Sequence, residues 1–257
     1  MPAALAFHQF PCRSDNYGVL VHDPEAATTA SIDAPDADAV RAALAQTGWT
    51  LTHILTTHHH ADHTEGNAAL KSDTGCTIIG PRAEQAKIPT LDSAVGEGDR
   101  VTFGTHEAEV FETPGHTAGH ISYLFRDAGV GFVGDTLFAL GCGRLFEGDA
   151  KTMWTSLEKI RAWPAETTLY CGHEYTLANA RFALTVDPEN SALAKRAKEI
   201  ETLRANDQPT LPTTLQAELE TSPFLRADDA GLRSALGMPD ADDWEVFAEV
   251  RRRKDAA

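Results

Sequence analysis

The sequence predicts a layered α/β domain followed by a helical domain, and three observations lead to this prediction. Short runs rich in Val, Ile, Phe and Tyr alternate irregularly with helical segments, which indicates layered sheets with much antiparallel pairing. All 11 His lie between His8 and His173. The residues that follow contain no His, no Cys and only two of the 19 Gly. We therefore expect one domain over residues 1–173 and a second, helical domain over residues 174–257.

The first domain is expected to consist of short strands bounded by turn residues, with a few helices between them. The expected strands are Leu5–Phe10, Tyr17–Val21, Ala30–Asp33, Thr52–Thr56, Thr77–Ile79, Val101–Phe103, Glu109–Glu112, Ile121–Phe125, Gly131–Gly134 and Thr168–Cys171. The expected helices of this domain are Asp36–Ala45, Glu65–Lys71 and Lys151–Ala162. In the second domain, prolines separate helices expected at Leu177–Leu184, Ser191–Ala205, Thr213–Glu220, Ala230–Ala235 and Asp242–Arg252.

The charge balance of the 257 residues excludes several classes of partner. Lys and Arg number 22 and Asp and Glu 38, so the formal net charge is −16. Nucleic acids and anionic membranes both require a basic surface, so we expect neither as a partner. No apolar run reaches the ~18 residues of a membrane span, and the first residues lack the basic start of a signal peptide.

The four Cys are far apart in the sequence and contain no C-x-x-C pair, which argues against a disulfide framework or a zinc ribbon. These residues are Cys12, Cys76, Cys142 and Cys171. Reduced thiols of this kind are typical of cytoplasmic proteins, and we expect this location. Two of them, Cys142 and Cys171, border the motifs described next, either as thiolate nucleophiles or, as we favour, as small packing residues.

The strongest functional signal is the segment Thr57–His63, which reads Thr-His-His-His-Ala-Asp-His after a strand-like run. In an extended chain residues two apart point the same way, so His58 and His60 can face one point. Asp62 and His63 follow where the chain bends, and their different direction would serve a second point nearby. Imidazole nitrogen and carboxylate oxygen suit Zn²⁺, Fe or Mn.

Three later segments repeat the pattern of an apolar strand, a tight turn and a ligand-type side chain. They deliver His116, Asp135 and His173. Ligands at strand ends sit on a rigid scaffold, which a preorganised site requires. The complete set exceeds what one tetrahedral metal takes, and it divides into three His for one ion and Asp plus two His for another, with Asp135 able to bridge. The seven potential ligands are His58, His60, Asp62, His63, His116, Asp135 and His173.

The spacing and order of these ligands resemble the metallo-β-lactamase superfamily. Further motifs over nearly the whole chain resemble one family within it, the hydroxyacylglutathione hydrolases (glyoxalase II). These motifs are Gly134–Phe138, Gly141–Gly148, Cys171–Thr176, Pro209–Leu215, Ser222–Arg226 and Arg251–Asp255. The resemblance implies an αββα sandwich with a dinuclear metal site at one sheet edge and a C-terminal helical domain that helps to bind glutathione.

The resemblance also implies the reaction, which is hydrolysis of S-(2-hydroxyacyl)glutathione. The typical substrate is S-D-lactoylglutathione, and the products are glutathione and D-lactate, in the second step of methylglyoxal detoxification. Two divalent ions, foremost Zn²⁺ with Fe or Mn as alternatives, would lower the pKa of bound water to about 7. Asp62 would ligate one ion and orient the resulting hydroxide, and Asp135 would bridge both. We expect a monomer that acts on a small glutathione thioester.

The glutathione contacts carry over position by position from the family. They are Arg144, Tyr175, Asn179, Arg251 and Lys254. At two positions the chain departs from some members: Arg144 stands where they have Lys, and Phe146 where they have Tyr. Arg keeps the positive charge with a different geometry, whereas Phe146 lacks a hydroxyl. His59 and His120 are either partners of the ligands or purely structural residues.

Four alternative functions remain open from the sequence. A persulfide dioxygenase of the same superfamily would hold one iron and consume oxygen. A lactonase or β-lactamase is disfavoured by the terminal cluster of Arg and Lys, and a nuclease by the charge of −16. A non-catalytic metal-binding module would close its coordination shell, whereas a hydrolytic site keeps a position open.

Overall fold

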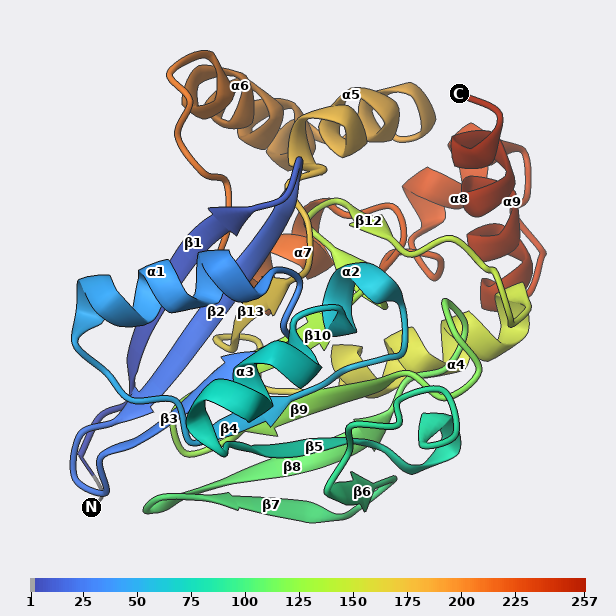
Figure 1. The fold of residues 1–257 in the computed structure, drawn as a ribbon. Helices are drawn as coiled ribbons and strands as arrows, with labels where there is room; N and C mark the ends of the chain where they lie inside the picture. Colours follow the sequence, from blue (N-terminus) through green and yellow to red (C-terminus); the bar gives the residue numbers. More distant parts are fainter. Residues whose placement is uncertain (1–2) are drawn as a thin grey trace. The chain divides into compact units, whose positions relative to one another are not determined.

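The computed structural model describes residues 3–257, which fall into two compact units (Figure 1). Unit 1 comprises the chain up to Glu112 together with Thr117–Gly134. Unit 2 comprises Thr113–His116 and Asp135–Ala257. The boundary that the sequence predicts at residue 173 is not tested by this division and stays a prediction.

The first sheet of unit 1 is mixed, and its strands follow one another in sequence order. β1, β2 and β3 pair antiparallel, and β3, β4, β5 and β6 pair parallel. The bounds are Ala6–Cys12 (β1), Asn16–Asp23 (β2), Thr28–Ile32 (β3), His53–Leu55 (β4), Thr77–Pro81 (β5) and Ser93–Val95 (β6). Helices occupy the connections between the parallel strands, as parallel pairing requires. They are α1 (Ala37–Thr47), α2 (Ala61–Thr64), α3 (Asn67–Thr74) and the 3₁₀ turn η1 (Arg82–Glu84).

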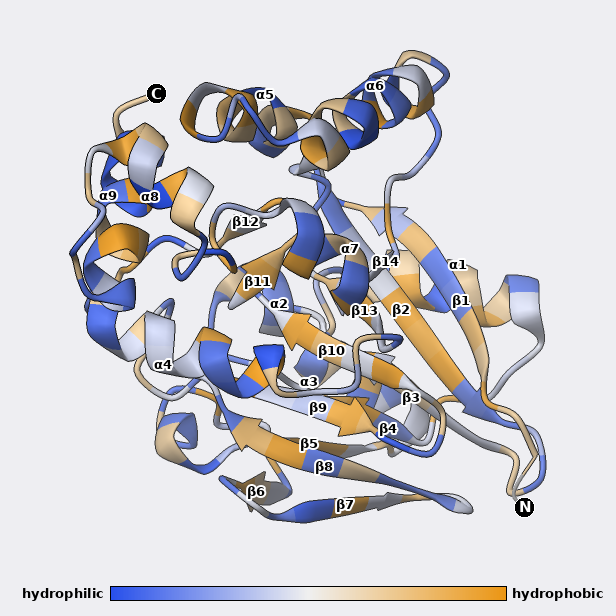
Figure 2. Ribbon diagram, turned by 180° about the vertical axis from the view of Figure 1, so that it is seen from behind, coloured by the Kyte–Doolittle hydropathy of each residue, from blue (hydrophilic) through white to orange (hydrophobic). Residues whose placement is uncertain are grey.

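The remaining strands of unit 1 form an antiparallel series in which each strand pairs with the next. They are β7 (Arg100–Phe103), β8 (His106–Glu112), β9 (Ile121–Phe125) and β10 (Val130–Gly134). β9 and β10 are buried along their whole length, which fits their largely apolar sequences, although β9 includes the buried Ser122. Figure 2 shows the middle of β2 and most of β10 in hydrophobic colours.

The two sheets of unit 1 face each other across a buried core. The hydroxyl of Tyr123 on β9 donates to the carbonyl of Thr56, which follows β4, over 2.9 Å. The ring of Phe7 on β1 lies 6.5 Å from that of Phe132 on β10. On the outer face of the first sheet, α1 and α3 cover a second core that includes Val40, Leu70 and the strand residues Leu20, Ile54 and Ile78.

One buried carboxylate ties the two sheets together at a shared end. Asp23 at the end of β2 accepts from the backbone N–H of Thr105 at 2.7 Å and from its hydroxyl at 2.9 Å. It also accepts from the N–H groups of Glu25 and Ala26. Gly104 has φ +58°, and a Cβ there would lie 2.2 Å from the Asp23 carboxylate, so this turn requires glycine. The turn between β7 and β8 is thereby held against the turn between β2 and β3.

Unit 2 is largely helical, with short paired strands. The strands are β11 (Leu137–Phe138), β12 (Gly141–Cys142), β13 (Thr168–Cys171) and β14 (Thr213–Thr214), which pair antiparallel as β11 with β12 and β13 with β14. The helices are α4 (Ala150–Arg161), α5 (Thr176–Val186), α6 (Ser191–Ala205), α7 (Leu215–Thr221), α8 (Ala230–Leu236) and α9 (Asp243–Asp255). Helices α5 and α6 pack around a core that includes Leu140, Ala183, Leu193 and Ile200. The rings of Trp154 on α4 and Phe247 on α9 lie 6.0 Å apart.

A fully buried carboxylate, Glu218 on α7, connects several parts of unit 2. One oxygen accepts from the backbone N–H of Leu140 at 2.8 Å, and the other pairs with Arg196 on α6. Thr213 donates to the same carboxylate at 2.8 Å. A carboxylate taken out of water needs such partners, and here they fix the β11–β12 turn to the helices.

Every strand and helix expected from the sequence overlaps an observed element, with two corrections at the boundaries. The helix expected at Thr213–Glu220 begins at Leu215, because Thr213 and Thr214 pair with Thr168 and Leu169. The helix expected at Glu65–Lys71 runs instead over Asn67–Thr74, after the separate helical turn α2. The short strands β6, β11 and β12 lie where no element was expected, and β14 lies where a helix was expected. Within residues 3–257, no helix combines the length and the apolar character needed to cross a membrane.

Candidate metal centre

In unit 1, the predicted ligand segment leaves the carboxyl end of β4 and runs into α2. The alternation expected for an extended chain is confirmed, because Nε2 of His58 lies 3.1 Å from Nδ1 of His60. The donor atoms of His58 and His63 lie within 4.8 Å of one another. Nε2 of His63 lies 3.7 Å from a carboxylate oxygen of Asp62. The four predicted ligands of this segment therefore converge.

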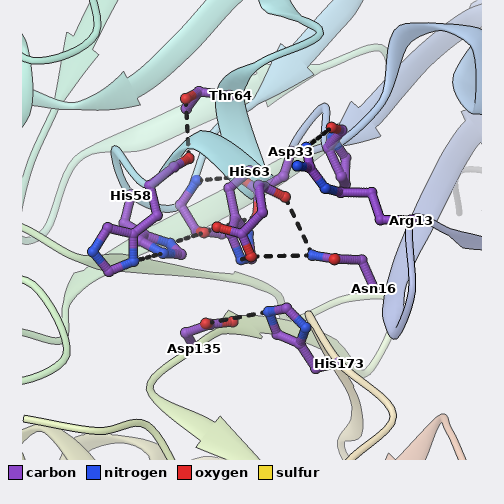
Figure 3. A network of polar contacts seen from close by, with 12 residues as sticks. Arg13, Asn16, Asp33, His58, His63, Thr64, Asp135 and His173 are labelled. Carbon is purple, nitrogen blue, oxygen red and sulfur yellow. Dashed lines mark hydrogen bonds and ion pairs between the residues drawn. The ribbon is translucent and has the colours of Figure 1, made fainter.

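Asp33, which follows β3 and is buried, organises these imidazoles (Figure 3). Its Oδ1 accepts from the backbone N–H of Thr57 at 2.7 Å, and its Oδ2 lies 2.9 Å from the Thr57 hydroxyl and 2.7 Å from Nδ1 of His63. Because the Thr57 hydroxyl donates to Asp33, it can accept from Nδ1 of His58, 3.0 Å away. Both imidazoles thus carry their proton on Nδ1 and leave Nε2 as a lone pair for a metal.

Sequence reasoning missed Asp33 as a site residue. The signal that could have found it was present, because Asp33 ends a predicted strand as Asp135 does. Its backbone has φ +56°, a left-handed conformation that is uncommon outside glycine and that Asp tolerates.

Asn16 at the start of β2 contacts Asp62, the carboxylate residue of the ligand segment. Its amide donates to the backbone carbonyl of Asp62 at 3.2 Å and to the Asp62 carboxylate at 3.4 Å (Figure 3). Asn16 itself is buried. The side chain of Asp62 is therefore held at a fixed direction although it is partly exposed.

Of the two histidines with open roles, His59 lies within the ligand segment and His120 packs against it. The ring of His120 is buried and stacks on that of His58 with a centroid distance of 4.9 Å. Nδ1 of His59 lies 3.0 Å from Oε2 of Glu84, which is also buried. Oε1 of Glu84 accepts from the backbone N–H of Gly119 at 3.0 Å. Glu84, a second residue missed by sequence reasoning, thus connects the ligand segment to the turn before β9.

In unit 2, the three remaining predicted ligands meet at one carboxylate oxygen. Oδ2 of Asp135 lies 3.4 Å from Nε2 of His116 and 3.4 Å from Nε2 of His173. Nδ1 of His116 lies 2.9 Å from the backbone carbonyl of Arg144, which can only accept, so Nδ1 carries the proton. The Nε2 lone pair of His116 therefore faces a carboxylate oxygen, an arrangement that a shared cation stabilises. The donor chemistry of this group fits a divalent metal ion.

Three of the six predicted substrate contacts lie around this group. The ring of Tyr175 stacks on that of His173 with a centroid distance of 4.8 Å and an interplanar angle of 2°. The ring of Phe146 lies 5.3 Å from that of His116, and 62% of Phe146 is exposed. Arg144, two residues earlier, is exposed. These three side chains lie at or near the surface of unit 2.

The other predicted contacts are more enclosed. Asn179 on α5 is buried and its amide donates to the carbonyl of Ala139 at 3.0 Å. Arg251 on α9 is 6% exposed and donates to the carbonyl of Cys142 at 2.9 Å. Lys254, one helical turn later, donates to the carbonyl of Ala178 at 3.3 Å and remains partly exposed.

The two cysteines near the site are buried thiols. Burial raises the pKa of Cys142 to about 11, although the neighbouring charge of Arg251 opposes this shift. Burial also raises the pKa of Cys171 to about 12. Both remain protonated at neutral pH, and only a thiolate is a strong nucleophile. Their state favours the packing role over nucleophilic catalysis.

Comparison with known proteins gives two family matches that together span most of the chain. Residues 28–173 match the model of the metallo-beta-lactamase superfamily. Residues 174–257 match the model of the hydroxyacylglutathione hydrolase C-terminus. A hydroxyacylglutathione hydrolase of Brucella anthropi is 62% identical over 251 residues, which are 98% of this chain and 96% of that protein.

Solved structures share the fold at lower identity. The crystal structure of ETHE1 from Myxococcus xanthus has a TM-score of 0.66 and 26% identity, and the match covers 96% of this chain and 90% of that one. The structure of TTHA1623 in a di-iron-bound form has a TM-score of 0.59 and 25% identity, over 88% of this chain and 100% of that one. The expected metallo-β-lactamase fold is confirmed by these matches.

Proposed function

This chain belongs to the hydroxyacylglutathione hydrolase family of the metallo-β-lactamase superfamily, and we propose from this membership and its ligand geometry how it works. It is a thioester hydrolase that acts on hydroxyacylglutathione. The substrate that we propose is S-D-lactoylglutathione, which is cleaved to glutathione and D-lactate in the second step of methylglyoxal detoxification.

The single observation that best supports a dinuclear mechanism is the position of Asp135. Its Oδ2 is equally distant, at 3.4 Å, from the Nε2 atoms of His116 and His173. A carboxylate placed between two ligands in this way suits a bridge between two ions. We assign His58, His60 and His116 to one ion, Asp62, His63 and His173 to the other, and Asp135 to both. Zn²⁺ is the ion that we propose for both positions, with Fe or Mn as alternatives of matching ligand chemistry.

Held by these residues, two such ions would lower the pKa of water to about 7, so that hydroxide is available at neutral pH, and would stabilise negative charge on the substrate oxygen. The residues of the chain direct this chemistry. Asp62, held by the amide of Asn16, orients the nucleophile toward the thioester carbonyl. Asp33 keeps His58 and His63 in the tautomer that ligates through Nε2. The leaving thiolate needs no strong acid, because thiol pKa values lie near about 8.5.

The anionic glutathione moiety needs positive charge, and unit 2 provides it despite the net charge of −16. Burial lowers the pKa of Lys254, and the positive charges of Arg251 and Arg144 lower it further, so the three cations lie within electrostatic reach of one another. We propose that Arg144, Tyr175, Lys254 and the exposed ring of Phe146 touch the substrate. Asn179 and Arg251 would support the backbone beneath the substrate, since their polar groups donate to the carbonyls of Ala139 and Cys142.

The two family matches support a proposal that metal binding and glutathione binding are carried by different parts of the chain. Residues 1–173 would supply most of the metal scaffold as the catalytic domain, and residues 174–257 would supply the helical glutathione-binding domain. Four free thiols fit a reducing cytoplasm, which is the location that we propose. Among the described residues, Phe146 and Tyr175 are the exposed large hydrophobic side chains, too little for a stable interface between copies. We therefore propose a monomer. The net charge of −16 supports the further proposal that it binds neither nucleic acid nor an anionic membrane.

The decisive experiment follows S-D-lactoylglutathione loss by the purified protein and measures metal content on the same sample. We expect hydrolysis with two metal ions per chain. Asp135→Ala should lose paired metals and activity, whereas Glu107→Gln, an exposed carboxylate paired with Arg100, should keep both. Two bound metals without hydrolysis would refute the proposal, and oxygen consumption with a single iron would identify a dioxygenase instead.

A further inference from the structure

Glu174 follows the proposed metal ligand His173 directly, in the short segment between β13 and α5 of unit 2. Only 10% of its side chain is exposed. Both carboxylate oxygens accept from one residue, since Oε2 lies 2.9 Å from the backbone N–H of Thr210 and Oε1 lies 2.6 Å from its hydroxyl. Nη1 of Arg204 lies 3.9 Å from Oε2 and adds a positive charge nearby. A carboxylate withdrawn from water beside a ligand calls for a role, and the proposed mechanism gives it none.

Thr210 also contacts the first residue of α5. Because the Thr210 hydroxyl donates its one proton to Glu174, it accepts from the hydroxyl of Thr176, 2.6 Å away. Thr176 is buried. Thr210 therefore holds the first and the third residue after His173, and these contacts fix the backbone that leaves the ligand.

The position of Thr210 is set by contacts of its own segment. That segment continues into β14 (Thr213–Thr214), which pairs with β13, the strand that leads to His173. The hydroxyl of Thr213 also donates to the fully buried carboxylate of Glu218 at 2.8 Å. Thr210 is thus anchored independently of the residues that follow His173.

The ring of His173 depends on this backbone for its direction. His173 is buried, and its Nε2 lies 3.4 Å from Oδ2 of Asp135. A functional side chain has to be held within about 0.5 Å of its productive position by packing and by hydrogen bonds of its neighbours. Strand pairing supplies this restraint before His173, and the contacts of Thr210 supply it afterwards.

We propose that Glu174 is a positioning residue for the metal ligand His173 and acts through its two hydrogen bonds with Thr210. This inference rests on the proposed function for the role of His173 as a ligand. A positioning role lowers the affinity for the ion that His173 holds and leaves the affinity for the other ion unchanged. A purely structural role would lower the stability of the chain and both metal affinities together.

The first test measures both metal affinities without substrate, by competition of the Zn²⁺-loaded protein with a chelator. Thr210→Val keeps the shape of the side chain and removes the hydroxyl, whereas Thr210→Ser keeps the hydroxyl. For Thr210→Val we expect the affinity for one of the two ions to fall about 10- to 100-fold, as for other partners of ligand residues. Thr210→Ser should bind both ions as wild type does. Thr155→Val, at an exposed threonine of α4, is the matched control and should leave both affinities unchanged.

The second test approaches the same contact from Glu174. In Glu174→Gln the amide offers one acceptor oxygen in place of two, so it accepts from only one of the two Thr210 donors. We expect a loss of affinity for the same ion as in Thr210→Val. The double variant should lose little more than the larger single loss, because both changes remove one shared interaction. Glu199→Gln, an exposed carboxylate of α6 paired with Lys195, is the matched control.

Urea unfolding of the metal-free variants separates positioning from general destabilisation. Equal losses of both metal affinities that follow the loss of stability would overturn the inference. Wild-type affinities in both Thr210→Val and Glu174→Gln would also overturn it, as would fully additive losses in the double variant. Thr210→Val alone decides the question if Glu174→Gln folds poorly. If wild type binds two metals but does not cleave the thioester, the proposed function fails while the metal-affinity comparison still decides the role of Glu174.

Discussion

Oδ2 of Asp33 lies 2.7 Å from Nδ1 of His63, and the same carboxylate reaches His58 through the hydroxyl of Thr57. One side chain therefore determines the tautomer of two proposed ligands, His58 and His63, which are five positions apart. It also accepts from the backbone N–H of Thr57, at the start of the ligand segment. Asp33 thus orients the rings of both His58 and His63.

Replacing Asp33 by Asn should weaken metal binding although the shape of the side chain is kept. An amide offers one acceptor oxygen where the carboxylate offers two, so the Thr57 or His63 contact is lost. We expect metal affinity or activity to fall about 10- to 100-fold. Chelator competition and metal analysis check this, with the exposed Asp38→Asn as control. Wild-type metal affinity in Asp33→Asn would show that the histidines hold their direction without it.

Glu84 should contribute through His59 and Gly119. In Glu84→Gln the amide oxygen can still accept from Gly119, but the NH₂ group replaces the carboxylate that faces Nδ1 of His59. Leaving a buried polar group mismatched costs roughly 1–3 kcal/mol, so the free energy of unfolding should fall by this amount. Urea unfolding of the metal-free protein measures the change. The exposed Glu65→Gln should have a much smaller effect, and equal effects would contradict the assigned role.

Lys254 should make substrate binding depend on pH below the range of an ordinary lysine. Burial lowers the pKa of Lys254, and the positive charges of Arg251 and Arg144 lower it further. Lys254 therefore loses its proton at a lower pH than an exposed lysine does. As the charge is lost, attraction for the glutathione carboxylates weakens and KM rises with pH. A KM profile up to pH 10 checks this, and Lys254→Met should flatten it at a higher KM. An identical profile in Lys254→Met would assign the titration to another group.

The cysteines beside the ligands should be dispensable for catalysis. With the pKa of Cys142 raised to about 11 and that of Cys171 to about 12 by burial, neither provides thiolate at neutral pH. Cys142→Ala and Cys171→Ala should keep kcat within about twofold, with modest losses of stability from the smaller side chain. Steady-state kinetics and thermal unfolding test this together. A loss of kcat beyond 100-fold with retained metals would restore the nucleophile hypothesis.

Acid should destabilise unit 1 in part through Asp23. Burial opposes its ionisation, but hydrogen bonds from Thr105, Ala26 and Glu25 lower its pKa to about 2. The stabilisation is present above the unfolded pKa of 3.8 and is lost as the pH falls through 2. Asp23→Asn should therefore unfold with about 2 kcal/mol less free energy at pH 7.

Urea titrations of the metal-free protein at pH 7 and pH 3 measure the Asp23 effect. The difference between Asp23→Asn and wild type should shrink at the lower pH, because the wild-type carboxylate has lost much of its advantage. Asp38→Asn, at an exposed carboxylate, serves as the control. If the difference in free energy of unfolding between Asp23→Asn and wild type stays constant with pH, its cause is packing and not the charge of Asp23.

Ligand-type residues at strand ends could be recognised from sequence because each one repeats a short local pattern. The alternation of His58 and His60 follows from the two-residue period of an extended chain, and the structure confirms it. The strands were recognisable for a related reason, since buried runs such as Ile121–Phe125 are rich in Ile, Leu, Tyr and Phe. Such features depend on neighbours in sequence and need no knowledge of the tertiary fold.

The supporting residues depend on contacts that are distant in sequence. Asp33 lies 30 positions from His63, and Arg251 lies 109 positions from Cys142. No local pattern tells whether a charged side chain at such a position faces solvent, a substrate or a backbone carbonyl. The terminal run that includes Arg251 and Lys254 illustrates this, because one of these cations is buried and the other remains partly exposed.

The chain passes between the two compact units after Glu112, after His116 and after Gly134. A gene fragment that ends at residue 173 would therefore cut through unit 2 and would not release a self-contained module. It would remove Glu218 from the N–H of Leu140 and Arg251 from the carbonyl of Cys142. We therefore do not expect residues 174–257 to fold and to bind glutathione when they are separated from the rest of the chain. Grafting it onto another metallo-β-lactamase scaffold should succeed only if the β11–β12 turn and its flanking ligands are transplanted with it.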